Sequence, residues 1–83
     1  MKENILINVL SVIRQNESHK AAKTLVLNFQ RVAGNVHTLD INSHLYKQTT
    51  VEKIVSVCQK FPQYLEHEFV YSTTLRLHFN LVD

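Results

Sequence analysis

The strictest pattern of hydrophobic and polar positions in this chain lies near its C-terminal end. Hydrophobic side chains alternate there with polar ones, in the order Leu75, Arg76, Leu77, His78, Phe79, Asn80 and Leu81. Strict alternation is typical of a β-strand with one buried face. An apolar run over residues 69–71 precedes it, with the polar residues 72–74 between them. The sequence therefore predicts that the chain ends in a β-hairpin.

Two helices are indicated by apolar residues at spacings of three and four. The first spans residues 3–15, where only Ile7 falls on the polar side. The second begins at Thr49, which forms the pattern of a capping box with Glu52 three residues later. Pro62 ends or kinks this helix because it cannot donate a backbone hydrogen bond. Between the two helices, residues 36–41 are compatible with a short strand.

Residues 19–33 fit either a helix or a strand. Their apolar residues fill one side of a helix, and Gly34 stands where a glycine would end it. Alternation over 24–32 favours a strand instead, and only the strand accounts for Leu27. The helix is preferred. The sequence then predicts one α+β domain over 1–83, with three helices and a small antiparallel sheet or C-terminal β-hairpin in a winged-helix-like outline.

The composition is that of a small globular domain, with 45% hydrophobic and 19% charged residues. No apolar run reaches the roughly 18–20 residues that span a bilayer, and the N-terminal residues lack the layout of a signal peptide. Cys58 is the single cysteine, so no internal disulfide can form, which favours a reducing compartment. We therefore expect a cytoplasmic protein that does not interact with membranes. Its short length and basic front half are compatible with viral or mobile-element origin.

The residue types that could carry chemistry show no catalytic or metal-binding pattern. The five histidines lack the paired spacing typical of structural zinc sites. Cys58 shares its helix face with Val51 and Ile54, which indicates a small buried hydrophobe and not a nucleophile. No serine elbow or glycine-rich phosphate loop occurs. We therefore expect neither an enzyme nor a metal, cofactor or small-molecule substrate.

One hypothesis for function is nucleic-acid binding. The net charge is only +2, but residues 1–39 carry five Lys and Arg residues against two Glu residues. If residues 19–33 form a helix, six side chains share its polar side: Lys20, Lys23, Thr24, Asn28, Gln30 and Arg31. Lys and Arg neutralise phosphates, and Asn, Gln and Arg hydrogen-bond base edges. This face is the candidate DNA-binding surface of a winged-helix-like regulator.

The preferred hypothesis is protein–protein binding. A domain with few strands cannot easily cover both edges of its sheet, and an unpaired edge can pair with another chain. The candidate partner strand is the closing one, from Leu75 to Leu81. It would form a homodimer or bind another protein by strand addition. The alternative is that it lies at the centre of a small sheet. The sequence thus predicts a small non-enzymatic regulatory or interaction protein, with nucleic-acid binding as the second hypothesis.

Overall fold

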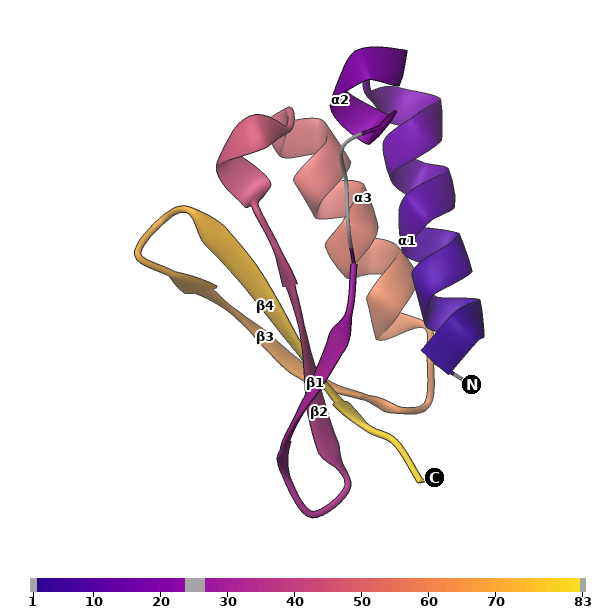
Figure 1. Ribbon diagram of the computed structural model, residues 1–83, viewed down its shortest axis with the longest axis vertical. Helices are drawn as coiled ribbons and strands as arrows, with labels where there is room; N and C mark the ends of the chain where they lie inside the picture. Colours follow the sequence, from indigo (N-terminus) through magenta and orange to yellow (C-terminus); the bar gives the residue numbers. More distant parts are fainter. Residues whose placement is uncertain (1, 24–26, 83) are drawn as a thin grey trace.

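The computed structural model describes residues 2–23 and 27–82. Its elements follow one another as α1 (Lys2–Asn16), α2 (His19–Lys23), β1 (Phe29–Ala33), β2 (Val36–Ile41), the 3₁₀-helix η1 (Ser43–Leu45), α3 (Gln48–Gln59), β3 (Tyr64–Val70) and β4 (Thr74–Asn80). Figure 1 shows the long helices α1 and α3 packed together beside the sheet. The predicted α+β class is confirmed. No helix in the described ranges is long and apolar enough to cross a bilayer.

The strands form one antiparallel sheet in the order β1-β2-β4-β3. The predicted C-terminal hairpin and the strand over 36–41 are both confirmed. β4 occupies an inner position, paired with β2 on one side and with β3 on the other. The outer strands are therefore β1 and β3.

Alternation in β4 determines which face of the sheet is buried. Its odd-numbered residues Leu75, Leu77 and Phe79 are fully buried, and its even-numbered residues are partly or fully exposed. The buried set packs with side chains from β2, α1 and α3, which together form the hydrophobic core: Ile5, Val9, Ile13, Leu39, Ile41, Val51, Ile54, Cys58, Leu75, Leu77, Phe79 and Leu81. The helices thus cover one face of the sheet, and the polar side chains lie on the other.

The helix predicted over 3–15 is confirmed as α1, and Ile7 is 62% exposed on it. The capping box predicted at Thr49 is wrong. α3 begins at Gln48, its N-cap residue is Lys47, and no side chain of that residue caps it. Proximity in the sequence was misleading here, because the carboxylate that accepts hydrogen bonds at the start of α3 belongs to Glu17, which follows α1.

The single helix predicted over 19–33 is also wrong. α2 is only five residues long and ends at Lys23, whereas Phe29–Ala33 is strand β1. Gly34 does not end a helix: with φ +56° it lies in the turn between β1 and β2, a conformation that glycine adopts without strain. The strand interpretation of the C-terminal half of this segment was therefore the correct one.

Candidate functional site

β3 is one of two outer strands of the sheet, and no described strand pairs with its outer side. It has seven residues, whereas β1, the other outer strand, has five. Its register against β4 shifts only between Tyr64 and Glu66 and is regular from Glu66 to Val70. An unpaired regular edge presents backbone N–H and C=O groups to which another extended chain can bond. β3 therefore offers the longer stretch of free edge.

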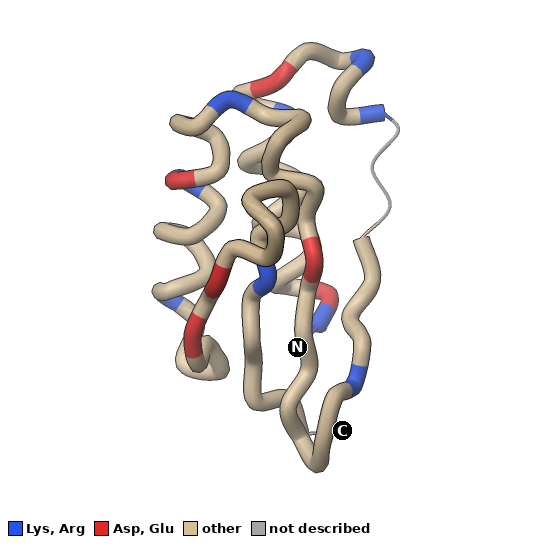
Figure 2. Tube along the Cα trace, turned by 90° about the vertical axis from the view of Figure 1, so that its left-hand side faces the viewer, with Lys and Arg blue, Asp and Glu red and all other residues tan. Residues whose placement is uncertain are grey.

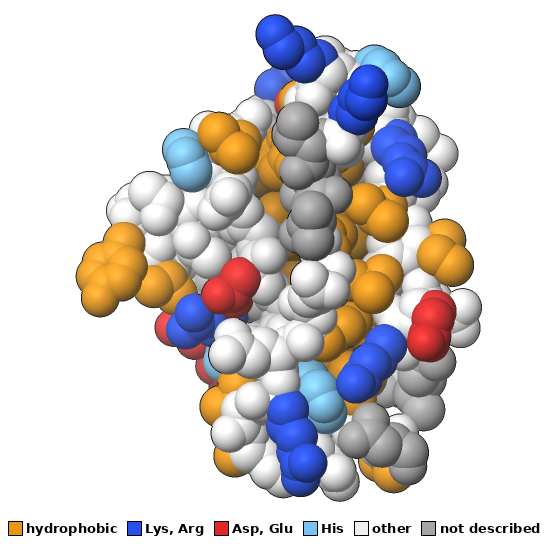
Figure 3. Space-filling model, viewed as in Figure 1, with side chains coloured by type: hydrophobic (Ala, Val, Ile, Leu, Met, Phe, Trp, Pro, Cys, Tyr) orange, Lys and Arg blue, Asp and Glu red, His pale blue; other side chains and the backbone are white. Residues whose placement is uncertain are grey.

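Large hydrophobic side chains are exposed along this strand and the turn that follows it. Leu65 is 48% exposed, Phe69 54% and Tyr71, in the turn, 91%. Hydrophobic side chains project from the hairpin end of the molecule in Figure 3. We call these three side chains, together with the outer backbone of β3, the β3 edge surface. Three exposed hydrophobic side chains along one strand and its turn are a feature of interaction surfaces more than of scattered surface residues.

The turn that carries Tyr71 is conformationally strained. Tyr71 and Ser72 have φ of 54° and 63°, and they are the non-glycine residues with positive φ in the described ranges. The Thr73 N–H donates to the Val70 carbonyl (3.2 Å), which closes a turn with two positive φ values, as in type I′. Asn and Gly are the residues that favour such a turn, and a tyrosine there costs conformational energy. Strain of this kind is often retained at functional sites.

A contact from η1 holds this turn in place. His44 Nδ1 lies 3.2 Å from the Thr73 carbonyl oxygen, within hydrogen-bonding distance. The two residues are 29 positions apart in the sequence, so the contact joins the β3–β4 hairpin to η1. Tyr71 is therefore presented from an anchored turn.

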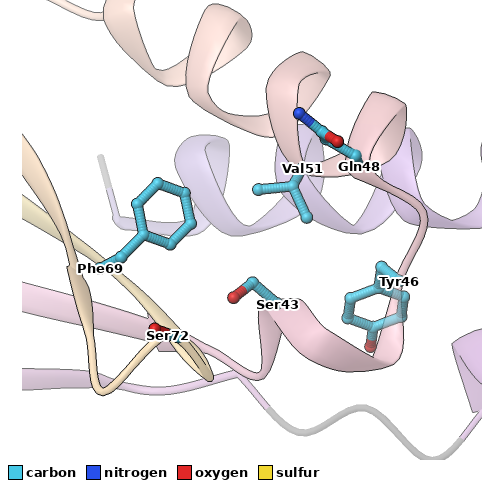
Figure 4. Close-up of a pocket in the computed structure, with 6 residues that line it drawn as sticks. All are labelled: Ser43, Tyr46, Gln48, Val51, Phe69 and Ser72. Carbon is cyan, nitrogen blue, oxygen red and sulfur yellow. The ribbon is translucent and has the colours of Figure 1, made fainter.

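A cavity of about 310 Å³ lies beside the β3 edge surface. Figure 4 shows it between the hairpin, η1 and the first turn of α3, with side chains from Phe69, Val51 and Ser43 around it. Tyr46, Gln48 and Ser72 complete the lining. Burial raises the pKa of the Tyr46 phenol, and the nearby Glu17 carboxylate raises it further, so this hydroxyl stays protonated at neutral pH. The cavity offers an apolar wall with neutral hydroxyl and amide groups, and nothing in it is a nucleophile–base pair.

The face of the sheet opposite the helices is polar and mainly acidic around β3. Arg76 makes two hydrogen bonds of 2.9 Å with Asp40, one to each carboxylate oxygen, and this pairing raises the pKa of its guanidinium. His78 Nε2 lies 2.7 Å from Glu68 Oε2. Glu66 makes no hydrogen bond or ion pair with the described residues. Figure 2 shows the two acidic positions of β3 in succession and no basic position on that strand.

Sequence spacing could not reveal that Glu66, Glu68 and His78 lie together. Their ligand atoms lie within 4.8 Å of one another, because His78 is directly opposite Glu66 in the β3–β4 register. Two carboxylates and an imidazole are donors that divalent transition metals accept. Glu68 and His78 already interact with each other, however, and the two glutamates are exposed, as acidic groups without a metal commonly are. No other group of this kind occurs in the described residues.

The candidate nucleic-acid residues do not form one surface. Lys20 and Lys23 lie on α2, whereas Gln30 and Arg31 lie on β1. Neighbouring residues of a strand point to opposite faces, so Gln30 and Arg31 cannot act together. The Arg31 Nε donates to the Gly34 carbonyl (2.8 Å). In Figure 3 the Lys and Arg side chains lie towards both ends of the face and form no continuous stripe.

Two further residues of that predicted surface add nothing to it. Asn28 is exposed between α2 and β1, outside any helix, and Thr24 lies outside the described residues. The winged-helix-like outline depended on a helix over 19–33 that would lie in the major groove. The structure has α2 and β1 in this segment instead. Nucleic-acid binding stays a prediction without the helical face that motivated it.

The partner strand predicted at Leu75–Leu81 is not available for pairing between chains. The backbone of β4 pairs on both sides within its own chain, from Leu75 to Asn80 with β2 and from Thr74 to Phe79 with β3. The second alternative, a central strand, is the correct one, and the free edge belongs instead to the neighbouring strand β3. The sequence signal for β3 was weak because none of its residues is fully buried and the register shift between Tyr64 and Glu66 interrupts alternation.

The prediction for Cys58 is confirmed: it is a buried hydrophobe on α3. Burial raises the pKa of its thiol to about 12, so the nucleophilic thiolate is not formed at neutral pH.

Comparisons of the chain with protein-family models, with curated proteins and with solved structures found no match. Any function is therefore inferred from the residues and geometry described above.

Proposed function

We propose that this chain is a non-enzymatic protein-binding domain that takes an extended segment of a partner protein as a fifth strand along β3. The observation that carries the proposal is the combination of a free, regular strand edge with exposed Leu65, Phe69 and Tyr71. In strand addition, main-chain hydrogen bonds supply affinity and pockets for alternate side chains supply specificity. The β3 edge surface and its adjoining cavity offer both.

β3 is a better docking edge than β1 for two reasons. β1 is shorter, and its register shifts between Arg31 and Ala33, so only three successive pairs, from Phe29 to Arg31, are regular. Its exposed large hydrophobic residue is Val32 alone, at 61%. Bulges and short length are the usual means by which proteins protect an edge from pairing. β1 has both, whereas the shift in β3 lies at its first residues and leaves five pairs regular.

The proposal is tested with a random library of eight-residue peptides, selected on the immobilised full chain. The expected result is a set of enriched peptides that slow amide hydrogen exchange along residues 64–70. Phe69→Ala should weaken their binding, because the side chain forms part of the contact. Val32→Ala is the matched control: it truncates a similarly exposed hydrophobic side chain on the other outer strand and should leave affinity unchanged. Enriched peptides that protect other amides, or no enriched peptide, would overturn the proposal.

A further inference from the structure

We infer that the segment bound along β3 carries Lys or Arg at alternating positions and hydrophobic residues between them. This inference rests on the proposed strand addition and adds the chemistry of the partner. It follows from the acidic side chains on one face of β3 and the exposed Phe69 on the other, from the register with β4 and from the poor fit of a second copy of the chain.

The register places Glu66 and Glu68 on one face of the sheet. Glu66 is opposite His78 and Glu68 is opposite Arg76. These partners belong to the face that the helices leave uncovered, since the intervening Leu77 is buried in the core. A new strand outside β3 would therefore place every second side chain next to these two carboxylates.

The donor groups already present on this face are engaged. Arg76 is held by Asp40 through both carboxylate oxygens, and His78 is paired with Glu68. The Glu66 side chain is exposed and makes no ion pair with the described residues. An incoming strand thus meets a surface with excess negative charge. Opposite charges directly across two antiparallel strands are stabilising, and like charges are destabilising.

The other face of β3 requires hydrophobic residues. Phe69 lies opposite Leu75, so its side chain is on the helix-covered side of the sheet, where it also lines the cavity. It is still 54% exposed, because no described element covers it. A hydrophobic side chain of the incoming strand would cover Phe69 and reach the cavity that separates it from Val51. The intervening positions of the partner are therefore apolar.

A second copy of this chain is a poor occupant. In a symmetric antiparallel pair of β3 strands, residues on the same face lie opposite each other. If the pair is centred on His67, Glu66 of one copy faces Glu68 of the second copy. If it is centred on Glu66 or on Glu68, that glutamate faces its own equivalent. These three registers are the ones that pair five or more residues of β3, and each opposes carboxylates directly, which is destabilising. Registers centred on Leu65 or Phe69 avoid this opposition but pair only three residues of β3. A basic segment removes this repulsion and replaces it with attraction.

The eight-residue library tests the partner chemistry by composition. Among the peptides that protect residues 64–70, Lys or Arg should be enriched at alternating positions. For the best such peptide, Glu66→Lys should weaken binding roughly 2- to 30-fold, since one attraction is lost and one repulsion is added. A peptide with Lys changed to Glu should bind the Glu66→Lys variant better than the wild-type chain. The control Glu52→Lys makes the same charge change on the exposed side of α3 and should change affinity less than about twofold.

The outcomes separate the two proposals. If peptides protect β3 but show no basic preference, strand addition stands and the partner chemistry inferred here is wrong. If no peptide protects β3, both are wrong. If the chain alone associates and its own β3 amides become protected, the occupant is a second copy, which overturns the inference and keeps β3 as the docking edge.

Discussion

Glu17 and Thr50 are 33 residues apart in the sequence, and the Thr50 hydroxyl donates a hydrogen bond to Glu17 Oε2. The same carboxylate oxygen accepts the backbone N–H of Lys47 at 3.0 Å. Glu17 follows the end of α1, and Lys47 is the N-cap residue of α3. A carboxylate near the first turn of a helix also interacts favourably with its dipole. One side chain from the end of α1 thus holds the start of α3 and fixes how the two helices meet.

Removal of the Glu17 carboxylate should destabilise the fold. Thr50 is fully buried, so Glu17→Ala leaves its hydroxyl without this acceptor, which costs about 1–3 kcal/mol in the free energy of unfolding. The value is measured by urea denaturation at neutral pH. Glu52→Ala on the exposed side of α3 is the matched control and should change stability by less than about 0.5 kcal/mol. Equal losses for both variants would contradict the role of Glu17.

The same contact predicts an acid-dependent loss of stability. The hydrogen bond from Thr50, followed by that from the Lys47 backbone and its charge, lowers the pKa of Glu17 below its ordinary value of 4.5, while partial burial opposes this. A carboxyl group with a lowered pKa in the folded state stabilises the fold above its unfolded pKa. This contribution is lost as the pH falls from about 4.5 through the folded pKa. The free energy of unfolding of Glu17→Ala should therefore fall less than that of the wild type over this range.

The Cys58 thiol should report unfolding. With a pKa of about 12 and no exposed surface, it should not react with a thiol reagent at pH 8 while the chain is folded. Stoichiometric labelling is expected only in denaturant, with a midpoint that matches the loss of helical circular dichroism. Rapid labelling of the native chain would contradict the packing of α3 against the sheet.

Local patterns in the sequence predicted the elements whose burial is one-sided. The hydrophobic stripe of α1 and the alternation of β4 follow directly from packing on a single core, and both elements were predicted correctly. The segment after Lys23 was not, because a glycine such as Gly34 serves a helix end and a β-turn equally well, and only the position of Leu27 favoured the strand.

The candidate site was predictable in kind but not in place. The shortage of strands correctly indicated a free edge, yet the free edge is β3 and not β4. An outer strand with two partly solvated faces, as over Tyr64–Glu68, has no alternation to reveal it. The contacts of Glu17 with Thr50 and of Glu68 with His78 depend on tertiary packing and strand register, which local spacing does not encode.

Phe79 should be among the side chains whose truncation costs most stability. It is fully buried, and its ring makes edge-to-face contacts with Phe29 of β1 at 5.6 Å and with Tyr64 of β3 at 6.2 Å. Phe79→Ala should lower the free energy of unfolding by about 3–5 kcal/mol, measured by urea denaturation. Val82→Ala, an exposed position near the C-terminal end, serves as the control. A loss below about 1 kcal/mol for Phe79→Ala would contradict the observed core.

The nucleic-acid hypothesis predicts a salt-dependent complex that is still specific at physiological salt, and we do not expect such a complex. The cations Lys20 and Lys23 lie on α2 and Arg31 lies on β1, so no single helix presents all three. Any retardation of duplex DNA at low salt should therefore disappear at physiological salt, as purely electrostatic binding does. A complex that persists there and is lost in a variant with all three changed to Glu would restore the hypothesis.

The strained turn predicts opposite effects on stability and on binding. Replacement of Tyr71 and Ser72 by Asn and Gly installs the residues that favour two positive φ values and should raise the free energy of unfolding by about 1–2 kcal/mol. The same change removes the side chain that is 91% exposed at the tip of the hairpin. Peptides selected on the wild-type chain should then bind more weakly, although the scaffold is more stable. Ser72→Gly alone separates the two effects, because it relieves strain and keeps Tyr71. If the double variant gains stability and binds as tightly as Ser72→Gly, Tyr71 does not belong to the β3 edge surface.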